Sequence, residues 1–445
     1  MDKMEWSRLL SAQRFGMEGW TSERKHDRTE FQRDYDRLIF SAPFRRLQNK
    51  TQVFPLPGNI FVHNRLTHSL EVSCVGRSLG NNIAHGIKSN YDKSQPWYKL
   101  FYECGNIVAA ACLAHDLGNP PFGHSGEKAI SSFFTEGKGM HLQQSMSKEE
   151  WDDLIHFEGN ANAFRLLTHK FNGRRDGGFA LTYSTLASIV KYPYASSLAT
   201  KSKFGFFTSE TNDFERIANE LGLIRYDKPY PSYARHPLVF LVEAADDICY
   251  QIMDIEDSHK LKILTTEETR GLLMAYFEES RQIRLEKALK YIDDTNEQIS
   301  YLRACVIGHL VDECSRVFIE NEDSILRGEF REPLIRHIDP IAYNAYSACS
   351  AIAYQKIYAS SDVLDIEVAG YQIIATLLSK LTDAVLNPHK EYSKLLLNRV
   401  PSQYETNAPT TYGKIQAVLD YISGMTDVYA LDLYRKINGM SLPAL

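Results

Sequence analysis

The sequence lacks the features that mark a secreted, membrane-spanning or disulfide-stabilised protein. Its seven cysteines are scattered without a Cys-X-X-Cys pair, which argues against a disulfide framework and against a thiolate zinc site. No apolar run approaches the roughly 18 residues needed to span a bilayer. The N-terminal stretch MDKMEWSRLLSAQRFG has no apolar core of the kind that a signal peptide requires. We therefore expect a cytoplasmic protein without membrane association.

The chain also lacks a strong charge of one sign, an internal repeat and a low-complexity tract. Its net charge of −6 offers no general attraction for nucleic acid or anionic membranes, although a local basic patch is compatible with it. Hydrophobic residues make up 44% and charged residues 24% of the chain, as in ordinary globular proteins. The length of 445 residues suggests two or three domains, but no linker stands out. We predict one large unit with appended lobes.

Helical spacing of apolar residues recurs along the chain, whereas the strict alternation of β-strands is scarce. Residues 70–83, 164–171 and 371–386 show this helical spacing most clearly. Residues 196–236 are rich in Ser, Thr, Tyr, Phe and Pro, and we expect them to form an irregular excursion or a small β-hairpin. The fold class predicted is mainly all-α.

Residues 1–55 carry many arginines interleaved with acidic residues. Such a mixed run indicates a solvated helix face or an intramolecular ion-pair network, more than an anion-binding site. The arginines are Arg24, Arg28, Arg33, Arg37, Arg45 and Arg46.

A His-Asp pair follows the apolar run 107–114. Successive helical residues point about 100° apart, so two neighbours converge on one ion more easily at a helix end than in its middle. The Gly-Asn-Pro-Pro sequence that follows predicts a helix end at this place. His115 and Asp116 together suit a divalent ion that activates water, provided that other segments supply further ligands.

Two further helices could supply those ligands. His68 begins an amphipathic helix, where it could also be a capping or core histidine. In the helix predicted over 239–260, one stripe carries Asp246, Tyr250, Asp254 and Asp257. The alternative is that this stripe simply faces solvent. An inward stripe would need pairing or a metal, because buried carboxylates are costly.

His68, His115, Asp116 and Asp246 could together form a four-ligand site. Nitrogen and oxygen ligands in this mixture favour Mn, Fe, Zn or another first-row ion over calcium. Other polar candidates follow the His-Asp pair in the chain. They are His124, Glu127, His156, Glu158 and Asn160.

These motifs, in this order, resemble the H…HD…D signature of the HD-domain phosphohydrolases. Within them the chain is similar to the bacterial deoxyguanosine triphosphate triphosphohydrolase (dGTPase-like) family over nearly its whole length. The resemblance implies an α-helical HD domain with additional helices around it. The blocks that carry it are 33–56, 63–72, 113–129, 156–167, 243–257 and 412–437.

The resemblance implies a role for each matching residue. The metal ligands would be His68, His115, Asp116 and Asp246, although the tandem Asp246-Asp247 leaves a one-residue ambiguity. His124 with Glu127 would form the catalytic His–acid pair, and His156 would be a second active-site histidine. The residues that would bind substrate are Arg65 and Lys191 for the phosphates, Tyr250 against the deoxyribose, and Gln52 with Asp254 at the 3′-hydroxyl.

The resemblance also implies an activity, namely metal-dependent hydrolysis of dGTP, and of other dNTPs as well, to a deoxynucleoside and tripolyphosphate. Mn, Mg or another first-row metal would be the cofactor. A homo-oligomer built from dimers is implied, with a hexamer as one candidate, and 341–359 is a candidate interface or core stretch. A regulatory dNTP or single-stranded DNA also fits the family. An HD-domain 5′-nucleotidase or phosphodiesterase, or a regulatory nucleotide-binding protein, stays open as an alternative.

The resemblance divides the chain into three segments. Residues 1–55 would form an N-terminal helical, arginine-rich segment. Residues 56–260 would form the HD-domain phosphohydrolase core, and residues 261–445 a C-terminal helical region packed on it.

Overall fold

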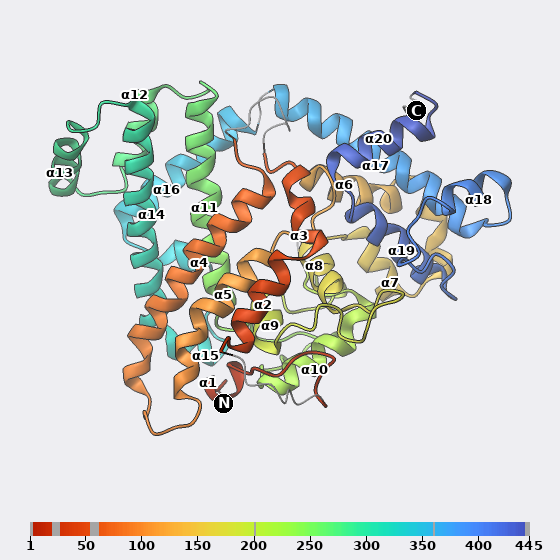
Figure 1. Cartoon of the computed structure of the whole chain (residues 1–445), viewed down its shortest axis with the longest axis horizontal. Helices are drawn as coiled ribbons and strands as arrows, with labels where there is room; N and C mark the ends of the chain where they lie inside the picture. The colour runs from red at the N-terminus through yellow and green to blue at the C-terminus, as the bar shows by residue number, and fades with distance from the viewer. Residues whose placement is uncertain (1–2, 20–26, 54–61, 200–201, 359–360, 441–445) are drawn as a thin grey trace.

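The computed structural model describes residues 3–19, 27–53, 62–199, 202–358 and 361–440, and it is mainly α-helical, as predicted (Figure 1). Within these ranges, β-structure is limited to isolated bridges. The α-helices are α1 (Trp6–Leu9), α2 (Glu30–Ile39), α3 (Ala42–Arg46), α4 (Arg65–Ile87), α5 (Cys104–Ala114), α6 (Gly123–Thr135), α7 (Lys148–Ile155), α8 (Gly159–Thr168), α9 (Tyr183–Ile189), α10 (Thr211–Leu221), α11 (Val239–Lys260), α12 (Thr266–Met274), α13 (Glu279–Leu289), α14 (Thr295–Glu320), α15 (Glu322–Leu326), α16 (Pro340–Ile352), α17 (Ser361–Leu386), α18 (Glu391–Leu397), α19 (Thr411–Ser423) and α20 (Asp427–Ile437). Short 3₁₀ or π turns are η1 (Leu47–Asn49), η2 (Lys88–Asn90), η3 (Tyr98–Glu103), η4 (Met140–Ser145), η5 (Ser196–Leu198), η6 (Thr208–Glu210), η7 (Leu334–His337) and η8 (Ala353–Ile357).

Helices α4 and α5 pack closely and form the centre of the first hydrophobic core. Glycines of α4 make the close approach possible: a Cβ at Gly76 would lie 2.5 Å from the sulfur of Cys112, and one at Gly80 would lie 2.7 Å from the Cys104 carbonyl oxygen. Every residue of α5 except Asn106 is buried, in agreement with the apolar run seen in the sequence. Helices α11 and α14 continue this core beside α4 (Figure 1).

A second hydrophobic core joins the middle of the chain to its C-terminal part. Helices α6 and α7 contribute Phe133, Phe134 and Trp151, which pack with apolar residues of α17, α19 and α20. Figure 1 shows α17 and α20 side by side near the C-terminus, with α6 and α19 beside them. The turn between α5 and α6 therefore connects the two cores.

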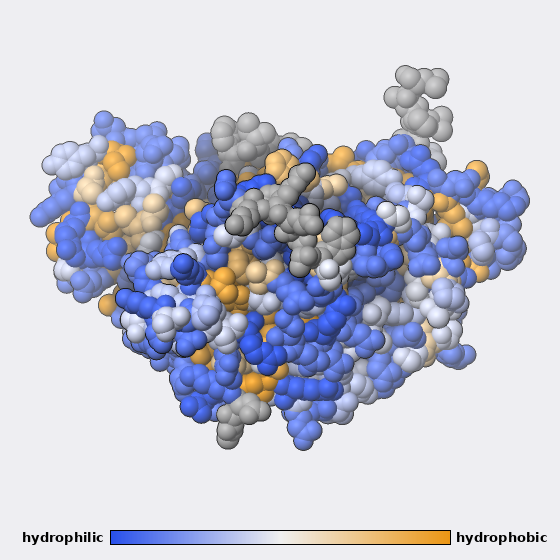
Figure 2. Space-filling model, turned by 60° about the horizontal axis from the view of Figure 1, so that its bottom comes forward, coloured by the Kyte–Doolittle hydropathy of each residue, from blue (hydrophilic) through white to orange (hydrophobic). Residues whose placement is uncertain are grey.

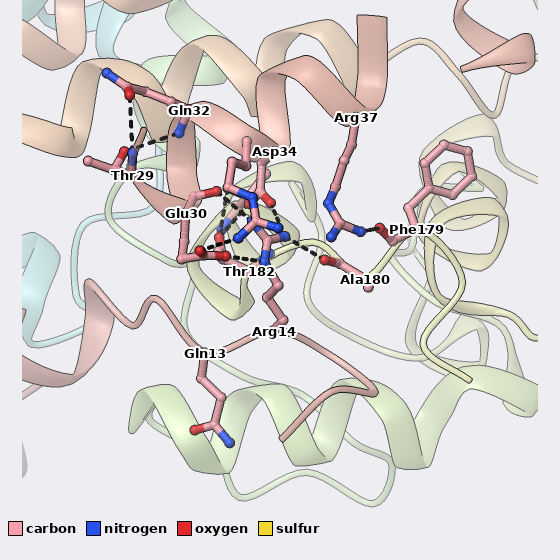
Figure 3. Close-up of polar contacts among 12 residues, drawn as sticks. Gln13, Arg14, Thr29, Glu30, Gln32, Asp34, Arg37, Phe179, Ala180 and Thr182 are labelled. Atoms are coloured by element: carbon pink, nitrogen blue, oxygen red, sulfur yellow. Dashed lines mark hydrogen bonds and ion pairs between the residues drawn. The ribbon is translucent and has the colours of Figure 1, made fainter. Parts of the chain in front are cut away.

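The arginine-rich N-terminal segment forms an ion-pair network in its described part (Figure 3). Arg14, which is 7% exposed, donates to Glu30 and, at 2.6 Å, to Asp34, which is fully buried. Arg33 also pairs with Glu30. The ion-pair alternative drawn from the sequence is thus confirmed for these residues, whereas Arg24 lies outside the described residues.

The stretch 196–236 is only partly irregular. It contains the helix α10, whose first-turn Asp213 and C-terminal Gly222 in the left-handed region (φ 68°) are typical helix-end residues. An antiparallel bridge joins Arg225 to Tyr233, and the amides of Tyr226 and Ala234 donate to the carbonyl oxygens of Ser232 and Ile224, so the described part of this stretch contains a minimal hairpin without a longer β-ladder. The helix was missed because its neighbours are rich in turn-forming residues.

Polar residues dominate the surface shown in Figure 2, where apolar side chains gather in small separate patches. Among the described residues no helix combines the length and the apolar character that crossing a membrane requires. All seven cysteines lie in the described ranges as free thiols.

Candidate active site

A cavity of about 640 Å³ lies where the two cores meet. Its wall combines the start of α4, the turn between α5 and α6, the first half of α11 and the segment that follows η8. Of the residues predicted from the sequence, those that line it are Gln52, Arg65, His115, Asp116, His124, Glu127, Lys191, Asp246 and Tyr250.

The predicted metal ligands converge from three helices. His68 lies in the first turn of α4, and His115 and Asp116 directly follow α5. One ligand atom from each of these three residues lies within 4.8 Å of the other two. The Asp246 carboxylate of α11 lies 3.1 Å from Nε2 of His68 and 3.5 Å from Nε2 of His115.

A helix cap sets the position of His68, and a hydrogen bond to the backbone sets the orientation of the His115 ring. The Asn64 side chain accepts from the amides of Leu66 and Thr67, so α4 begins at Arg65 and His68 lies in its first turn. Nδ1 of His115 lies 2.6 Å from the Cys112 carbonyl oxygen, which holds the hydrogen on Nδ1 and leaves the Nε2 lone pair for a metal.

The environment of His115 fits a metal ion. Its Nε2 is buried and has no hydrogen-bond partner among the described residues. Burial opposes the charged form, but Asp116 and Asp246 outweigh it and raise the pKa of His115 to about 9. Two carboxylates beside a largely buried imidazole thus attract positive charge, and a divalent cation would neutralise them.

Arg65 shapes the charge of Asp116. Its Nη1 donates to Asp116 at 2.7 Å, and Asn119 donates to the other carboxylate oxygen. Burial disfavours the charged carboxylate, yet Arg65 and the nearby imidazoles hold the pKa of Asp116 below its usual value. Asp116 therefore stays an anion suited to bind a metal at neutral pH.

The geometry separates the tandem aspartates on α11. Asp246 faces the two histidines, and these outweigh burial to lower its pKa well below the usual value. Asp247 does not line the cavity, and burial together with Glu243 and Asp246 raises its pKa to about 7. The structure thus directs Asp246, and not Asp247, towards the other candidate metal ligands.

His124 and Glu127 form a hydrogen-bonded pair in the first turn of α6. Nδ1 of His124 lies 2.8 Å from Glu127, whose other carboxylate oxygen accepts from the Gly159 amide at 2.8 Å. Glu127 is buried, whereas the His124 side chain is 74% exposed and borders the cavity. Burial opposes ionisation of Glu127, but His124 lowers its pKa. This arrangement orients an accessible imidazole with its other nitrogen free for proton transfer.

Two lysines bring positive charge to the same cavity. Lys191 pairs with Glu243 at 3.1 Å, and this carboxylate outweighs burial to raise its pKa. Lys203 pairs at 2.6 Å with Glu158, the N-cap residue of α8. Lys203 was missed because it lies in the weakly periodic stretch 196–236 and belongs to no motif.

An aromatic pair forms another part of the wall. The rings of Tyr250 and Tyr358 have centroids 6.2 Å apart and are tilted by 30°. Tyr358, which the sequence placed only in the candidate interface or core stretch 341–359, donates at 2.5 Å to Asp254, and burial raises the pKa of that carboxyl to about 7. Asp254 lies behind the lining and is not paired with Gln52, whose buried Oε1 has no hydrogen-bond partner among the described residues.

His156 is the predicted catalytic residue that the structure does not bring to the cavity. It is the C-cap residue of α7, and Glu158 and Asn160 of the following turn line the cavity instead. Its Nδ1 is buried without a hydrogen-bond partner among the described residues. A catalytic role for His156 stays a prediction that its position does not support.

Two family models match separate parts of the chain. Residues 65–190 match the HD domain, and residues 340–436 match the phosphohydrolase-associated domain. The first match contains three of the four candidate metal ligands, and the second contains the helices of the second core that pack against the α5–α6 turn.

Curated proteins align with nearly the entire chain. A deoxyguanosinetriphosphate triphosphohydrolase-like protein of Pseudomonas aeruginosa is 37% identical, over 99% of this chain and 100% of its own length. A protein of the same description from Synechocystis is also 37% identical, with the same two coverages. The deoxyguanosinetriphosphate triphosphohydrolase of Yersinia enterocolitica is 30% identical over 98% of this chain and 99% of its own.

Proposed function

Because the chain belongs to the dGTPase-like family of HD-domain hydrolases, we propose that it hydrolyses deoxynucleoside triphosphates, with dGTP preferred, to a deoxynucleoside and tripolyphosphate. One observation carries this proposal: a single cavity is lined by His115, Asp116 and Asp246, with His68 in contact with Asp246, and by an oriented His–Glu pair and three cationic side chains. These groups match the needs of phosphate-ester hydrolysis, which are charge neutralisation, water activation and proton transfer.

The ligand set is His68, His115, Asp116 and Asp246. A bound Mn, Mg or other first-row ion would polarise the α-phosphate and lower the pKa of a bound water. Asp116 and Asp246 supply the negative charge that holds the ion, and Arg65 keeps Asp116 oriented through its 2.7 Å hydrogen bond.

Cationic side chains would hold the triphosphate. Arg65 is 6% exposed and borders the cavity beside the metal ligands, which suits an oxygen near the reacting phosphorus. Lys191 and Lys203 each have a buried carboxylate partner, Glu243 and Glu158. A polyphosphate would bind their ammonium groups alongside these carboxylates, because a displaced buried carboxylate would be left unpaired at a high cost.

His124 would transfer the proton that the reaction requires. The 5′-oxygen is a poor leaving group unless it is protonated, and a positioned acid increases the rate by a factor on the order of 10² to 10⁴. Glu127 fixes the imidazole through Nδ1, so Nε2 is the atom that exchanges the proton.

Tyr250 and Tyr358 would form the deoxyribose side of the site. A tyrosine ring beneath the sugar leaves little room for a 2′-hydroxyl, which favours deoxynucleotides over ribonucleotides. Gln52 would bind the 3′-hydroxyl through its unpartnered Oε1. Asp254 would not touch the sugar but would orient Tyr358 by accepting its hydroxyl hydrogen.

Self-association and regulation by a dNTP or single-stranded DNA belong to the same proposal. Apolar side chains exposed on α16 and α17 support a homo-oligomer. Among them are Ile341 at 46%, Leu364 at 47% and Val368 at 72% exposure.

Product analysis tests the activity. The purified chain is incubated with each of the four dNTPs and with GTP, with and without Mn²⁺, and ³¹P NMR identifies the products. Tripolyphosphate formed from dGTP, but not from GTP, is the expected result. Release of orthophosphate or a nucleoside monophosphate would instead indicate a nucleotidase or phosphodiesterase, and binding without turnover would indicate a regulatory protein.

The tandem aspartates provide a matched pair of variants for the metal site. Asp246→Asn removes a candidate ligand, whereas Asp247→Asn changes its neighbour, which does not line the cavity. We expect titration calorimetry to show Mn²⁺ binding in D247N but not in D246N, with triphosphohydrolase activity following the same pattern. His115→Ala and Asp116→Ala should behave like D246N while keeping the helical circular dichroism spectrum. Equal metal binding in D246N and D247N would contradict the ligand assignment.

A further inference from the structure

The turn that carries His124 has a backbone conformation that needs support. Phe122 has φ 62° and ψ 18° in the left-handed region, and Gly123 follows with φ 56°. A residue with a Cβ rarely adopts this conformation unless surrounding contacts impose it. Helix α6 begins directly after Phe122, so this conformation sets where α6, and with it His124, starts.

Asp427 holds this turn from the C-terminal part of the chain. It is the first residue of α20 and is 6% exposed. One of its carboxylate oxygens accepts from the Phe122 amide at 2.9 Å, and the other accepts from the Thr51 amide at 2.8 Å. Phe122 and Thr51 both line the cavity, and Thr51 precedes Gln52. A single buried carboxylate thus joins two walls of the cavity through their backbones.

Helix α17 supports the same turn from another side. A Cβ at Gly370 would lie 2.6 Å from Cβ of Phe122, so the glycine allows α17 to pack directly on the strained residue. The Ser125 hydroxyl donates at 2.6 Å to the carbonyl oxygen of Glu367. These contacts flank His124 on both sides in the sequence.

A buried lysine ties the first half of the turn to α19. Nζ of Lys50 donates to the carbonyl oxygens of Asn119, at 2.6 Å, and of Ser423, at 2.8 Å. The α5–α6 turn therefore contacts α17 and α20 directly and α19 through Lys50, and all three helices lie within the segment 340–436 or end beside it. The segment 340–436 contains none of the four candidate metal ligands. It supports the backbone of the turn that carries His115, Asp116 and the His–Glu pair.

We propose that Asp427 is a positioning residue for the reaction. By accepting both amides it holds the start of α6 at a fixed place relative to Thr51 and the metal ligands, so that His124 points at the reacting phosphate ester. The proposal rests on the proposed function for its catalytic consequence. A group displaced by about 1 Å from its productive position can lower the rate by about 100-fold, so loss of this carboxylate should act mainly on kcat.

A purely structural role is the competing explanation. Asp427 lies in the first turn of α20, where an acidic residue also stabilises a helix through its dipole. The two roles differ in what they change: a dipole effect lowers stability alone, whereas positioning changes kcat through His124.

The principal variant is Asp427→Asn, which preserves the size of the side chain. Asparagine keeps one carbonyl oxygen for one amide and turns an NH₂ group towards the other, so one of the two hydrogen bonds is lost. We expect kcat to fall by roughly 10- to 100-fold. KM should change less, because Arg65, Lys191 and Lys203 are untouched and Thr51 keeps its bridge to Asn64.

The matched control is Asp34→Asn. Asp34 is also a buried aspartate and accepts a backbone amide, that of Thr182, at 2.9 Å (Figure 3). It does not line the cavity. It should lose stability on substitution and keep kcat close to that of the unmodified chain. A fall in kcat in D34N as large as that in D427N would overturn the proposal.

A double-mutant cycle identifies the residue through which Asp427 acts. If it acts by placing His124, D427N should lower kcat strongly in the unmodified chain but by less than about threefold in the His124→Ala background. Multiplicative losses in the two backgrounds would overturn the proposal.

Hydrogen–deuterium exchange separates this inference from the proposed function. D427N should speed exchange of the Phe122 and Thr51 amides, and D34N should leave them protected. Unchanged protection in D427N would overturn the positioning role even in an active enzyme. Faster exchange in a chain that hydrolyses no dNTP would leave Asp427 as the support of the turn and refute the proposed function instead.

Discussion

At the scale of single residues, His124 combines exposure with a fixed orientation. Its imidazole is reachable from the cavity, while its Nδ1 is held by the buried Glu127. Glu127 is in turn held by the Gly159 amide, so the pair has little freedom to rotate. A histidine held in this way loses little entropy on reaching the transition state, which is what an efficient proton-transfer group requires.

Substituting His124 should separate chemistry from metal binding. We expect His124→Ala to lower kcat by about 10² to 10⁴, which corresponds to roughly 2.7–5.4 kcal/mol of lost barrier reduction. Mn²⁺ affinity should be unchanged, because His124 is not in the ligand set. Steady-state kinetics and calorimetry on the same preparation test both parts. Loss of metal binding in this variant would show that His124 belongs to the metal site.

The residues of the candidate site differ in how strongly the sequence predicts them. His115 and Asp116 could be predicted because an apolar run ends there in a turn. His68 and Asp246 were candidates from their positions on two further predicted helices, and the family resemblance implies the same four ligands. Lys203 and Tyr358 could not be predicted, since each reaches the cavity from an irregular connection whose path depends on tertiary packing. Asp254 lies on α11 with Asp246 and Tyr250, but it does not line the cavity and bonds to Tyr358 instead of Gln52, which the sequence does not reveal.

At the scale of elements, the success of prediction follows the strength of the local signal. The helix α5 is an uninterrupted apolar segment, and its end at Ala114 agrees with the sequence. The helix α10 was missed because its amphipathic pattern is short and lies between turn-rich segments. Boundaries of this kind depend on the core against which a helix packs, and one sequence does not reveal that core.

A buried carboxyl between α7 and α19 gives the fold a pH dependence. Asp153 accepts from the Tyr412 hydroxyl at 2.6 Å and from the Thr208 amide at 2.7 Å. Its other oxygen has no partner among the described residues, and burial raises its pKa to about 7. Between about pH 4 and pH 7 the folded chain therefore keeps a proton that the unfolded chain has released.

The sign of this linkage leads to a specific expectation. Because unfolding releases the proton in this window, the free energy of unfolding should fall as pH rises from about 4 to 7, by at most about 1.4 kcal/mol per pH unit from this group. Asp153→Asn cannot lose a proton, so its stability should vary less with pH. Urea titrations at pH 5, 6, 7 and 8 compare the two chains. Parallel pH profiles would show that Asp153 is ionised in the folded state.

At the scale of the whole molecule, the candidate active site is a junction between two cores. Helices α4 and α11 and the end of α5, in the first core, bring the candidate metal ligands, whereas α6 of the second core brings His124 and Glu127. Segments far apart in the sequence thus meet at one cavity. Local sequence patterns predict the individual helices and candidate ligands. They do not predict how these segments come together, because that depends on the packing of α17 and α20 against the α5–α6 turn.

A metal ion at this junction should stabilise the folded chain as a whole. His68, His115 and Asp246 belong to three different segments, and unfolding would separate them, so an ion binds the folded state preferentially. At a free concentration 100 times the dissociation constant, it adds about 2.7 kcal/mol, which should raise the unfolding midpoint by a few degrees. Differential scanning calorimetry with chelator and then with Mn²⁺ measures the shift. D247N should show the shift and D246N should not; a shift of equal size in both variants would mean that the stabilising ion binds elsewhere on the molecule.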